Sequence, residues 1–239
     1  MVSVTHAISS HDAAPPLELI SEGLDAGECK QVEEALALAE EAYEGHVLGT
    51  GESALTHALG MALIAASLKL DAETRIAGLL FSVCEYQDDA AEIIAKRFSP
   101  AVGELVSGLR RLNGLRLLTR KTSRATAPEI RAQTEVLRKM LLGMVQDIRV
   151  VLLRLASRTQ TLRFFTEEPP ETLLEIARES LDIYAPLANR LGVWQLKWEL
   201  EDLSFRFLEP ETYKRIARML DERRSEREEF IQQSIERLR

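Results

Sequence analysis

A cluster of basic residues near the middle of the chain is the first feature whose chemistry can be named. The interval between Glu104 and Glu129 contains no acidic residue, and it holds six cations: Arg110, Arg111, Arg116, Arg120, Lys121 and Arg124. In a chain with a net charge of −8, such a concentration of guanidinium and ammonium groups indicates a surface that faces an anion. The alternative is a solvated loop with a basic bias and no ligand.

His57 and Glu85 are the other side chains that could transfer protons or bind a metal. His57 lies among apolar residues in a segment with helical periodicity, so a hydrogen-bonded histidine in the core or in a pocket is the simpler interpretation. Glu85 is interpreted in the same way, as a hydrogen-bonding or capping group. Cys29 and Cys84 show neither metal-ligand nor redox spacing, which suits a reducing cytoplasm.

Helices must position these residues, because Leu, Ala, Glu and Arg dominate a sequence with only 12 Gly and 8 Pro. With 239 residues, 46% of them hydrophobic, the chain can bury a sizeable core, and an all-α fold is predicted. The pattern predicts helices over 28–44, 53–68, 88–98, 100–112, 129–145 and 147–165, one helix capped by Asp71, a kinked stretch over 171–207, a loop over 113–128 and a last helix from Pro210.

Trp194 and Trp198 lie four residues apart, on one face of the helix expected there. Two large rings at this spacing are typical of the core or of a surface that packs against another domain. A platform for stacking bases is the alternative.

Three regions are expected along the chain. Residues 1–18 are polar, contain proline and lack periodicity, which is typical of a disordered segment. Residues 19–207 would form the helical domain, and residues 208–239 would form a C-terminal helix that leads into a further domain. The sequence shows no signal peptide and no apolar run of membrane-spanning length, so a cytoplasmic protein without a membrane partner is expected.

Several segments of the chain resemble the N-terminal region of the long RelA/SpoT-type stringent-response proteins. The sequence IYAPLANRLGVWQLKWELEDLSFRFLEPETYKRIA (183–217) is similar to that family almost word for word, and MLLGMVQDIRVVLLRLA (140–156) is equally close. AGLLFSVCEY (77–86) resembles the family's AALLHDVIED, and LLRLASRTQTLR (152–163) resembles its LIKLADRLHNMR. The resemblance runs from about Glu28 to the C-terminus, and it implies an HD-domain-like multi-helix bundle.

The resemblance also implies a metal site, in which two His and two Asp side chains hold a divalent metal, usually manganese. Such a metal polarises the phosphate of the alarmone (p)ppGpp and lowers the pKa of a bound water. His57 matches the first ligand, whereas Phe81 and Ser82 stand at the His-Asp doublet and Ser157 stands at the distal Asp. Because phenyl and alkyl hydroxyl groups are poor ligands for Mn²⁺, no metal is expected here.

The positions that the family uses to activate water are changed as well. Glu85 matches one of two catalytic carboxylates, but Tyr86 replaces the other. Gln160 and Thr161 stand where hydrolytic members have His-Asn. The resemblance therefore implies that most of the residues for hydrolysis are missing.

Leu48 and Gly49 stand where active members have an Arg-Lys pair that helps to hold the nucleotide. These losses resemble the synthetase-only RelA branch, whose HD-like region no longer hydrolyses (p)ppGpp. The resemblance thus implies a catalytically inactive, regulatory module of a GTP pyrophosphokinase, the enzyme that makes (p)ppGpp. Two alternatives stay open: a pocket that senses a guanine nucleotide without chemistry, and a residual metal-dependent (p)ppGpp phosphohydrolase.

Cofactors and partners follow from the same resemblance. The hydrolase-like region would need no cofactor, whereas the synthetase domain, expected beyond Arg239, would need magnesium. The partners would be that synthetase domain, a guanine nucleotide if the pocket binds one, and the ribosome with uncharged tRNA through a further C-terminal region.

Overall fold

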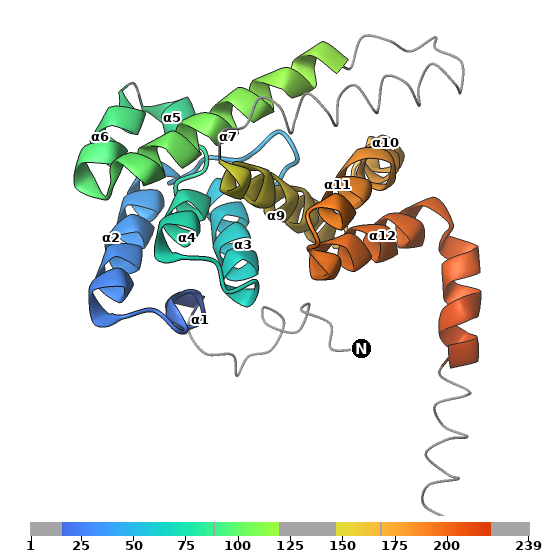
Figure 1. The fold of residues 1–239 in the computed structure, drawn as a ribbon. Coiled ribbons are helices and arrows are strands. Elements are labelled where there is room, and N and C mark those ends of the chain that lie inside the picture. Colours follow the sequence, from blue (N-terminus) through green and yellow to red (C-terminus); the bar gives the residue numbers. More distant parts are fainter. Residues whose placement is uncertain (1–15, 88, 120–146, 168, 221–239) are drawn as a thin grey trace, which may run out of the picture.

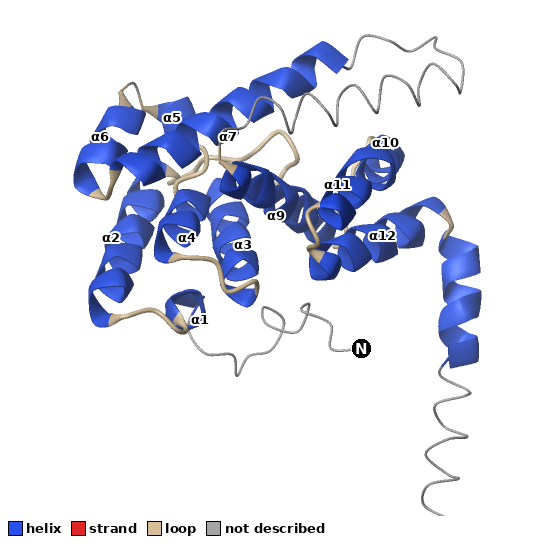
Figure 2. Cartoon of the chain, in the orientation of Figure 1, coloured by secondary structure: helices blue, strands red, loops and turns tan. Residues whose placement is uncertain are grey.

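The chain folds into helices in the computed structural model, which describes residues 16–87, 89–119, 147–167 and 169–220 (Figures 1 and 2). No β-strand occurs in these ranges, and the predicted all-α fold is confirmed. The helices are α1 (Pro16–Ser21), α2 (Ala26–Ala42), α3 (Ala54–Ser67), α4 (Ala72–Leu79), α5 (Val83–Tyr86), α6 (Ala90–Arg97), α7 (Pro100–Thr119), α9 (Ile148–Phe164), α10 (Leu173–Glu179), the π-helix η2 (Ser180–Tyr184), α11 (Ala185–Arg190) and α12 (Trp194–Leu208). A further helix covers residues 210–220.

Side-chain caps fix the residue at which several helices begin. Asp25 starts α2 with a capping box, because its carboxylate accepts from the amide of Glu28 while the Glu28 side chain accepts from Asp25. Ser53 caps α3, and Asp147 caps α9. The predicted cap at Asp71 is confirmed at the start of α4. These caps matter for function because α3 and α9 carry the polar residues described below.

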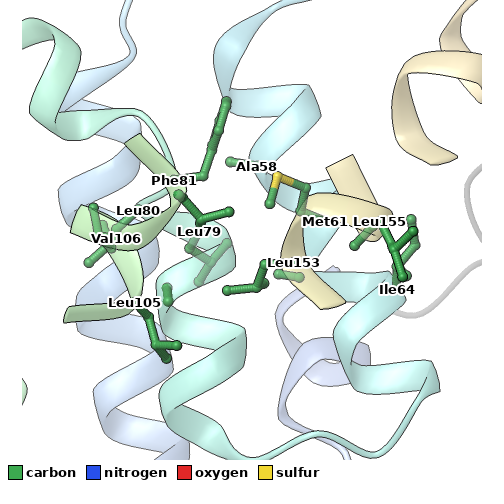
Figure 3. Close-up of a cluster of buried hydrophobic side chains, with 14 of the residues drawn as sticks. Ala58, Met61, Ile64, Leu79, Leu80, Phe81, Leu105, Val106, Leu153 and Leu155 are labelled. Atoms are coloured by element: carbon green, nitrogen blue, oxygen red, sulfur yellow. The ribbon is translucent and has the colours of Figure 1, made fainter. Parts of the chain in front are cut away.

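Helices α3, α4 and α9 pack against one another at the centre of the domain, and α2 and α7 pack against α4. Figure 3 shows the buried cluster that they form, with Met61 from α3, Leu79 from α4, Leu105 from α7 and Leu153 from α9. Both α3 and α9 are covered on several sides: the buried residues of α3 are apolar apart from His57, whereas α9 buries polar and charged side chains as well. Any polar side chain on their inner faces is therefore removed from water and needs a hydrogen-bond partner.

The helical stretch over 171–207, which the sequence predicts to be broken or kinked around Pro186 and Gly192, consists of α10, η2, α11 and α12. The predicted break at Gly192 is confirmed: α11 ends before it, and its φ of 73° is a left-handed conformation that glycine adopts without strain. The π-helical turn η2 lies directly before Pro186, whose ring and missing N–H disturb a regular α-helical ladder.

Two sequence expectations need correction at their boundaries. The loop predicted over 113–128 is wrong for residues 113–119, because α7 continues to Thr119. The unstructured N-terminal segment cannot include residues 16–18, because α1 begins at Pro16 and buries Ile20. Residues 1–15 and 120–146, with the helix predicted over 129–145, lie outside the described residues.

In the part of the chain that the structure describes, no helix combines the length and the apolar character that crossing a membrane requires.

Candidate functional site

His57 lies near the start of α3 and is buried, with 2% of its surface exposed. Its Nδ1 is 2.6 Å from Oε2 of Glu52, a residue of the preceding loop that is itself 1% exposed. A carboxylate removed from water in this way is stable only when hydrogen-bond donors surround it. His57 is thus a hydrogen-bonded histidine in the core, in agreement with the simpler interpretation of its sequence.

Ser157 reaches His57 from α9, and its Oγ lies 2.9 Å from Nε2 of the imidazole. A carboxylate accepts hydrogen bonds, so Nδ1 of His57 carries a proton and donates it to Glu52. In the neutral imidazole, Nε2 then holds a lone pair, to which the Ser157 hydroxyl donates. The order of groups is carboxylate, imidazole, hydroxyl, and all three are buried.

Gln160 completes this cluster from the next turn of α9. Its Nε2 donates to Oε1 of Glu52 at 2.6 Å, so both carboxylate oxygens have a donor. The side chain fits only because α3 has a glycine at the contact: a Cβ on Gly60 would come within 2.2 Å of Gln160 Oε1. We call Glu52, His57, Ser157 and Gln160 the Glu52 network.

Phe81 fills the space beside the network. It lies with Ser82 in the junction between α4, which ends at Leu79, and α5, which begins at Val83. Its ring centroid is 5.0 Å from that of His57, and 7% of the residue is exposed. The apolar ring thereby fills volume next to the imidazole that would otherwise be a cavity.

Ser82 and Tyr86, the two other positions at which the family resemblance implies a carboxylate, carry neutral side chains. The Ser82 amide donates to Oη of Tyr43 at 3.1 Å, and the buried Ser82 hydroxyl has no partner among the described residues. Burial raises the pKa of Tyr43, so its phenol stays protonated. Tyr86 stacks on His46, with ring centroids 4.0 Å apart.

Other residues singled out in the sequence lie outside the Glu52 network. Glu85 is exposed on α5. Thr161 is buried, but its hydroxyl donates to the Ser157 carbonyl at 3.0 Å. Leu48 belongs to the loop before α3 and packs on the core, whereas Gly49 is exposed in a turn.

Arg110 and Arg111 are exposed on α7. Arg110 lies near α5: burial raises the pKa of the Cys84 thiol, and the nearby Arg110 charge opposes that shift. Arg116 lies on α7, but its side chain is outside the described residues, as are Arg120, Lys121 and Arg124. The anion-facing surface stays a prediction.

The donor set at the former cage does not fit a divalent metal. Both ring nitrogens of His57 are engaged, and both oxygens of Glu52 have donors. Phe81 offers no donor atom, and the two serines offer neutral hydroxyls. Over the described ranges, no three His, Cys, Asp or Glu side chains come together as potential ligands.

A second buried network holds the opposite side of α9. Nη2 of Arg158 lies 2.5 Å from Oε2 of Glu179, and its guanidinium lies over the Tyr184 ring. Nη2 of Arg154 donates to Tyr184 Oη at 3.1 Å. Burial alone would raise the pKa of Tyr184, but the two guanidinium charges lower it below its usual value. These contacts tie α9 to α10 and η2, and so fix the helix that carries Ser157.

The sequence did not single out Glu52, which organises the site. A signal was present: Thr50-Gly51-Glu52 comes directly before the Ser53 cap, and Glu52 lies five residues before His57. Nothing in that spacing says that the carboxylate turns inward, because the turn leading into α3 decides its direction.

Comparisons with known proteins agree with this architecture. A family profile described as HD domain matches residues 35–194. The bifunctional (p)ppGpp synthase/hydrolase SpoT of Escherichia coli is 38% identical over 218 residues, which cover 91% of this chain and 30% of that protein. A GTP pyrophosphokinase of Myxococcus xanthus is 36% identical over 208 residues, which cover 87% of this chain and 27% of that protein.

A solved structure, described as a metazoan ortholog of SpoT that hydrolyses ppGpp, is 21% identical with a TM-score of 0.46, and the match covers 74% of this chain and 94% of that one. The chain spans less than a third of the length of the curated relatives named above. With the HD profile over two thirds of its residues and these relatives along most of its length, the chain belongs to the RelA/SpoT family and is an HD domain of that type.

Proposed function

We propose that this chain is the non-catalytic HD-like domain of a RelA-type GTP pyrophosphokinase, and that it regulates (p)ppGpp synthesis in the cytoplasm. The Glu52 network carries the proposal. At the centre of the former metal cage, the retained histidine makes hydrogen bonds to a glutamate and a serine, and a phenylalanine ring covers it.

Hydrolysis of a pyrophosphate ester at neutral pH requires a strong nucleophile and neutralisation of developing charge. In an HD site the metal supplies both, because it lowers the pKa of a bound water and polarises the phosphate. Here the positions that would hold it are Phe81, Ser82 and Ser157, and Tyr86 stands in place of a carboxylate. The buried Glu52 carboxylate would also repel the phosphate.

An exposed apolar surface on α12 is the second support for a regulatory role. Trp194 and Trp198 are 52% and 58% exposed on α12, which excludes the core, one of the two places expected for them. Their rings lie 6.4 Å apart and form an apolar surface on the helix that precedes the last described one. Figure 1 shows that last helix leaving the body of the domain. Packing of α12 against a synthetase domain stays a prediction.

In this proposal the domain itself uses no cofactor, and magnesium serves the synthetase. The ribosome and uncharged tRNA act through other regions of the whole protein. A guanine nucleotide would bind to this domain only if Arg110, Arg111 and the basic residues that follow them face the region around the Glu52 network.

The direct test is an assay of ppGpp hydrolysis by the 239-residue chain in the presence of Mn²⁺. We expect no release of pyrophosphate above the rate without protein. A SpoT-type hydrolase, assayed in parallel, controls for substrate and metal. Metal-dependent turnover by this chain would overturn the proposal and favour the residual phosphohydrolase.

A further inference from the structure

The order of groups in the Glu52 network is that of an acyl-transfer triad. Ser157 Oγ lies 2.9 Å from Nε2 of His57, and Nδ1 of His57 lies 2.6 Å from Glu52. In such an arrangement the imidazole takes the hydroxyl proton as a general base, and the carboxylate holds the ring in the correct tautomer and stabilises the imidazolium. The triad is recognised by geometry and not by sequence order.

We propose that Ser157 is a nucleophile toward small carboxylic esters, activated by His57 and Glu52. The proposal is independent of the proposed regulatory function, because it concerns a reaction that needs neither metal nor nucleotide.

Neighbouring residues hold Glu52 and His57 in position. Gln160 donates to the second oxygen of Glu52 and so fixes the plane of the carboxylate. The imidazole is wedged between this carboxylate and the Phe81 ring, and it is 2% exposed. Low exposure strengthens the hydrogen bonds within the triad, because water does not compete for them.

The surroundings select the class of electrophile. Ser157 is 8% exposed, so a large acyl group is excluded. The Phe81 ring offers apolar contact to a short acyl chain, whereas the Glu52 carboxylate disfavours a phosphate. Arg158, the neighbouring cation on α9, is engaged with Glu179 and the Tyr184 ring.

The step balances as an acyl transfer. Ser157 Oγ forms a bond to the carbonyl carbon while its proton passes to Nε2 of His57. The bond between that carbon and the alcohol oxygen then breaks, and the imidazolium returns the proton to the leaving alcohol. The products are acyl-Ser157 and a free alcohol, with no oxidant or co-reactant required.

The test is a reaction of the whole chain with p-nitrophenyl acetate, followed by release of p-nitrophenolate and by mass spectrometry of the peptides. We expect one acetyl group on Ser157 and a burst that disappears in Ser157→Ala. Glu52→Gln keeps an acceptor for His57 but removes the charge, and it should slow acetylation of Ser157 at least tenfold.

Ser180→Ala is the matched control, because the Ser180 hydroxyl is also buried in a helix but donates to the Ile176 carbonyl at 2.7 Å. It should leave the burst unchanged. Acetyl groups found only on lysines or the N-terminus, or equal rates at Ser157 in the parent and in Glu52→Gln, would overturn the proposal. Should Glu52→Gln not fold, the burst in Ser157→Ala decides the question.

Discussion

At the scale of single residues, Glu52, His57, Ser157 and Gln160 are joined by buried hydrogen bonds, so a change at one of them alters the surroundings of the others. A carboxylate introduced at Ser157 would lie beside His57 Nε2, which the serine hydroxyl now contacts at 2.9 Å, and it would share the buried cluster with Glu52. Two buried carboxylates that share one imidazole repel each other unless a cation or a proton lies between them. The site cannot be reverted one ligand at a time without cost.

Restoring the ligands should therefore not restore hydrolysis. In the variant Phe81→His, Ser82→Asp, Ser157→Asp, Tyr86 still replaces a catalytic carboxylate, and the Leu48-Gly49 turn still lacks the charges that hold the nucleotide. We expect Mn²⁺ to bind but ppGpp turnover to stay at background, as measured by calorimetry and pyrophosphate release. Substantial hydrolysis would show that Tyr86 and the Leu48-Gly49 turn matter less than argued.

Gly60→Ala tests the contact beneath the network. Alanine is favoured over glycine inside a helix by about 1 kcal/mol, so an unconstrained site would become more stable. Here the new Cβ would meet Gln160, whose amide is held by Glu52. We expect a net loss of about 1–3 kcal/mol in the free energy of unfolding, because Gln160 must leave its buried partner.

Denaturant melts of Gly60→Ala, Gln160→Ala and the double variant measure this loss. The double variant should be no less stable than Gln160→Ala alone, since the clash is gone. Gly49→Ala is the control, because a Cβ there meets nothing within 4 Å and should change stability by less than about 0.5 kcal/mol. Stabilisation by Gly60→Ala would contradict the packing described.

At the scale of helices, much of the fold followed from the sequence, because apolar periodicity and caps are local signals. The starts of α3, α4 and α9 agree with their Ser53, Asp71 and Asp147 caps. The end of α7 was missed, because the basic residues that suggested a loop continue along a helix to Thr119. The partners of His57 were missed for another reason: Glu52 and Ser157 are 105 residues apart, and only tertiary packing brings them to one imidazole.

Helix α12 carries both an exposed and a buried apolar residue, and their substitutions should have different effects on stability. Trp198 is 58% exposed, so Trp198→Ala should leave the free energy of unfolding within about 0.5 kcal/mol of the parent. Leu200 on the same helix is fully buried, and Leu200→Ala should cost about 2–5 kcal/mol. Denaturant melts of the two variants measure the contrast, and a large loss in Trp198→Ala would contradict the exposed position.

The same Trp198→Ala change in the whole protein should alter the rate of (p)ppGpp synthesis if α12 packs against the synthetase. A synthesis assay with the matched Leu174→Ala variant, which changes another exposed apolar residue on α10, controls for general surface effects. Equal rates in the parent and in Trp198→Ala would remove this residue from the interface.

Arg149 joins the starts of α4 and α9 through ion pairs with Asp71, Glu73 and Asp147. Burial would raise the pKa of Asp71, but hydrogen bonds from Thr74 and Arg149 lower it. Hydrogen bonds from Arg149 lower the pKa of Asp147, against the effect of burial. Carboxylates with depressed pKa values contribute stability above their usual pKa, and this contribution is lost as the pH falls through the folded value.

Arg149→Met should therefore destabilise the chain at pH 7 by about 1 kcal/mol or less, since the pairs are partly exposed. The difference from the parent should shrink as the pH falls below ~4, because the unfolded chain then takes up protons at Asp71 and Asp147 before the folded parent does. Urea melts at pH 7 and pH 3 measure it. Lys30→Met, which removes an exposed pair with Glu34, should change stability at neither pH.

At the scale of the whole molecule, the chain keeps the HD fold, and the Glu52 network and the Phe81 ring lie at its centre. Helices α3, α4 and α9 pack against one another there, and both ring nitrogens of His57 and both carboxylate oxygens of Glu52 have hydrogen-bond partners. Stability of this domain should then be independent of the metal. In a functional HD site, folding and metal binding are coupled, because the cage exists only in the folded state.

Thermal unfolding with and without Mn²⁺ measures that coupling. A ligand present at one hundred times its Kd stabilises the folded state by about 2.7 kcal/mol. For a domain of this size, each kcal/mol raises the melting temperature by about 2–4 °C, so a working cage would shift it by roughly 5–10 °C. We expect Mn²⁺ to shift the melting temperature of this chain by less than about 1 °C, while a SpoT-type hydrolase under the same conditions shows the full effect.

Addition of ppGpp without metal then separates the two remaining roles of the domain. A rise in melting temperature that disappears in the double variant Arg110→Ala, Arg111→Ala indicates a nucleotide-sensing surface on α7. If ppGpp leaves the melting temperature unchanged, the domain acts by packing alone, and its effect on synthesis passes through α12.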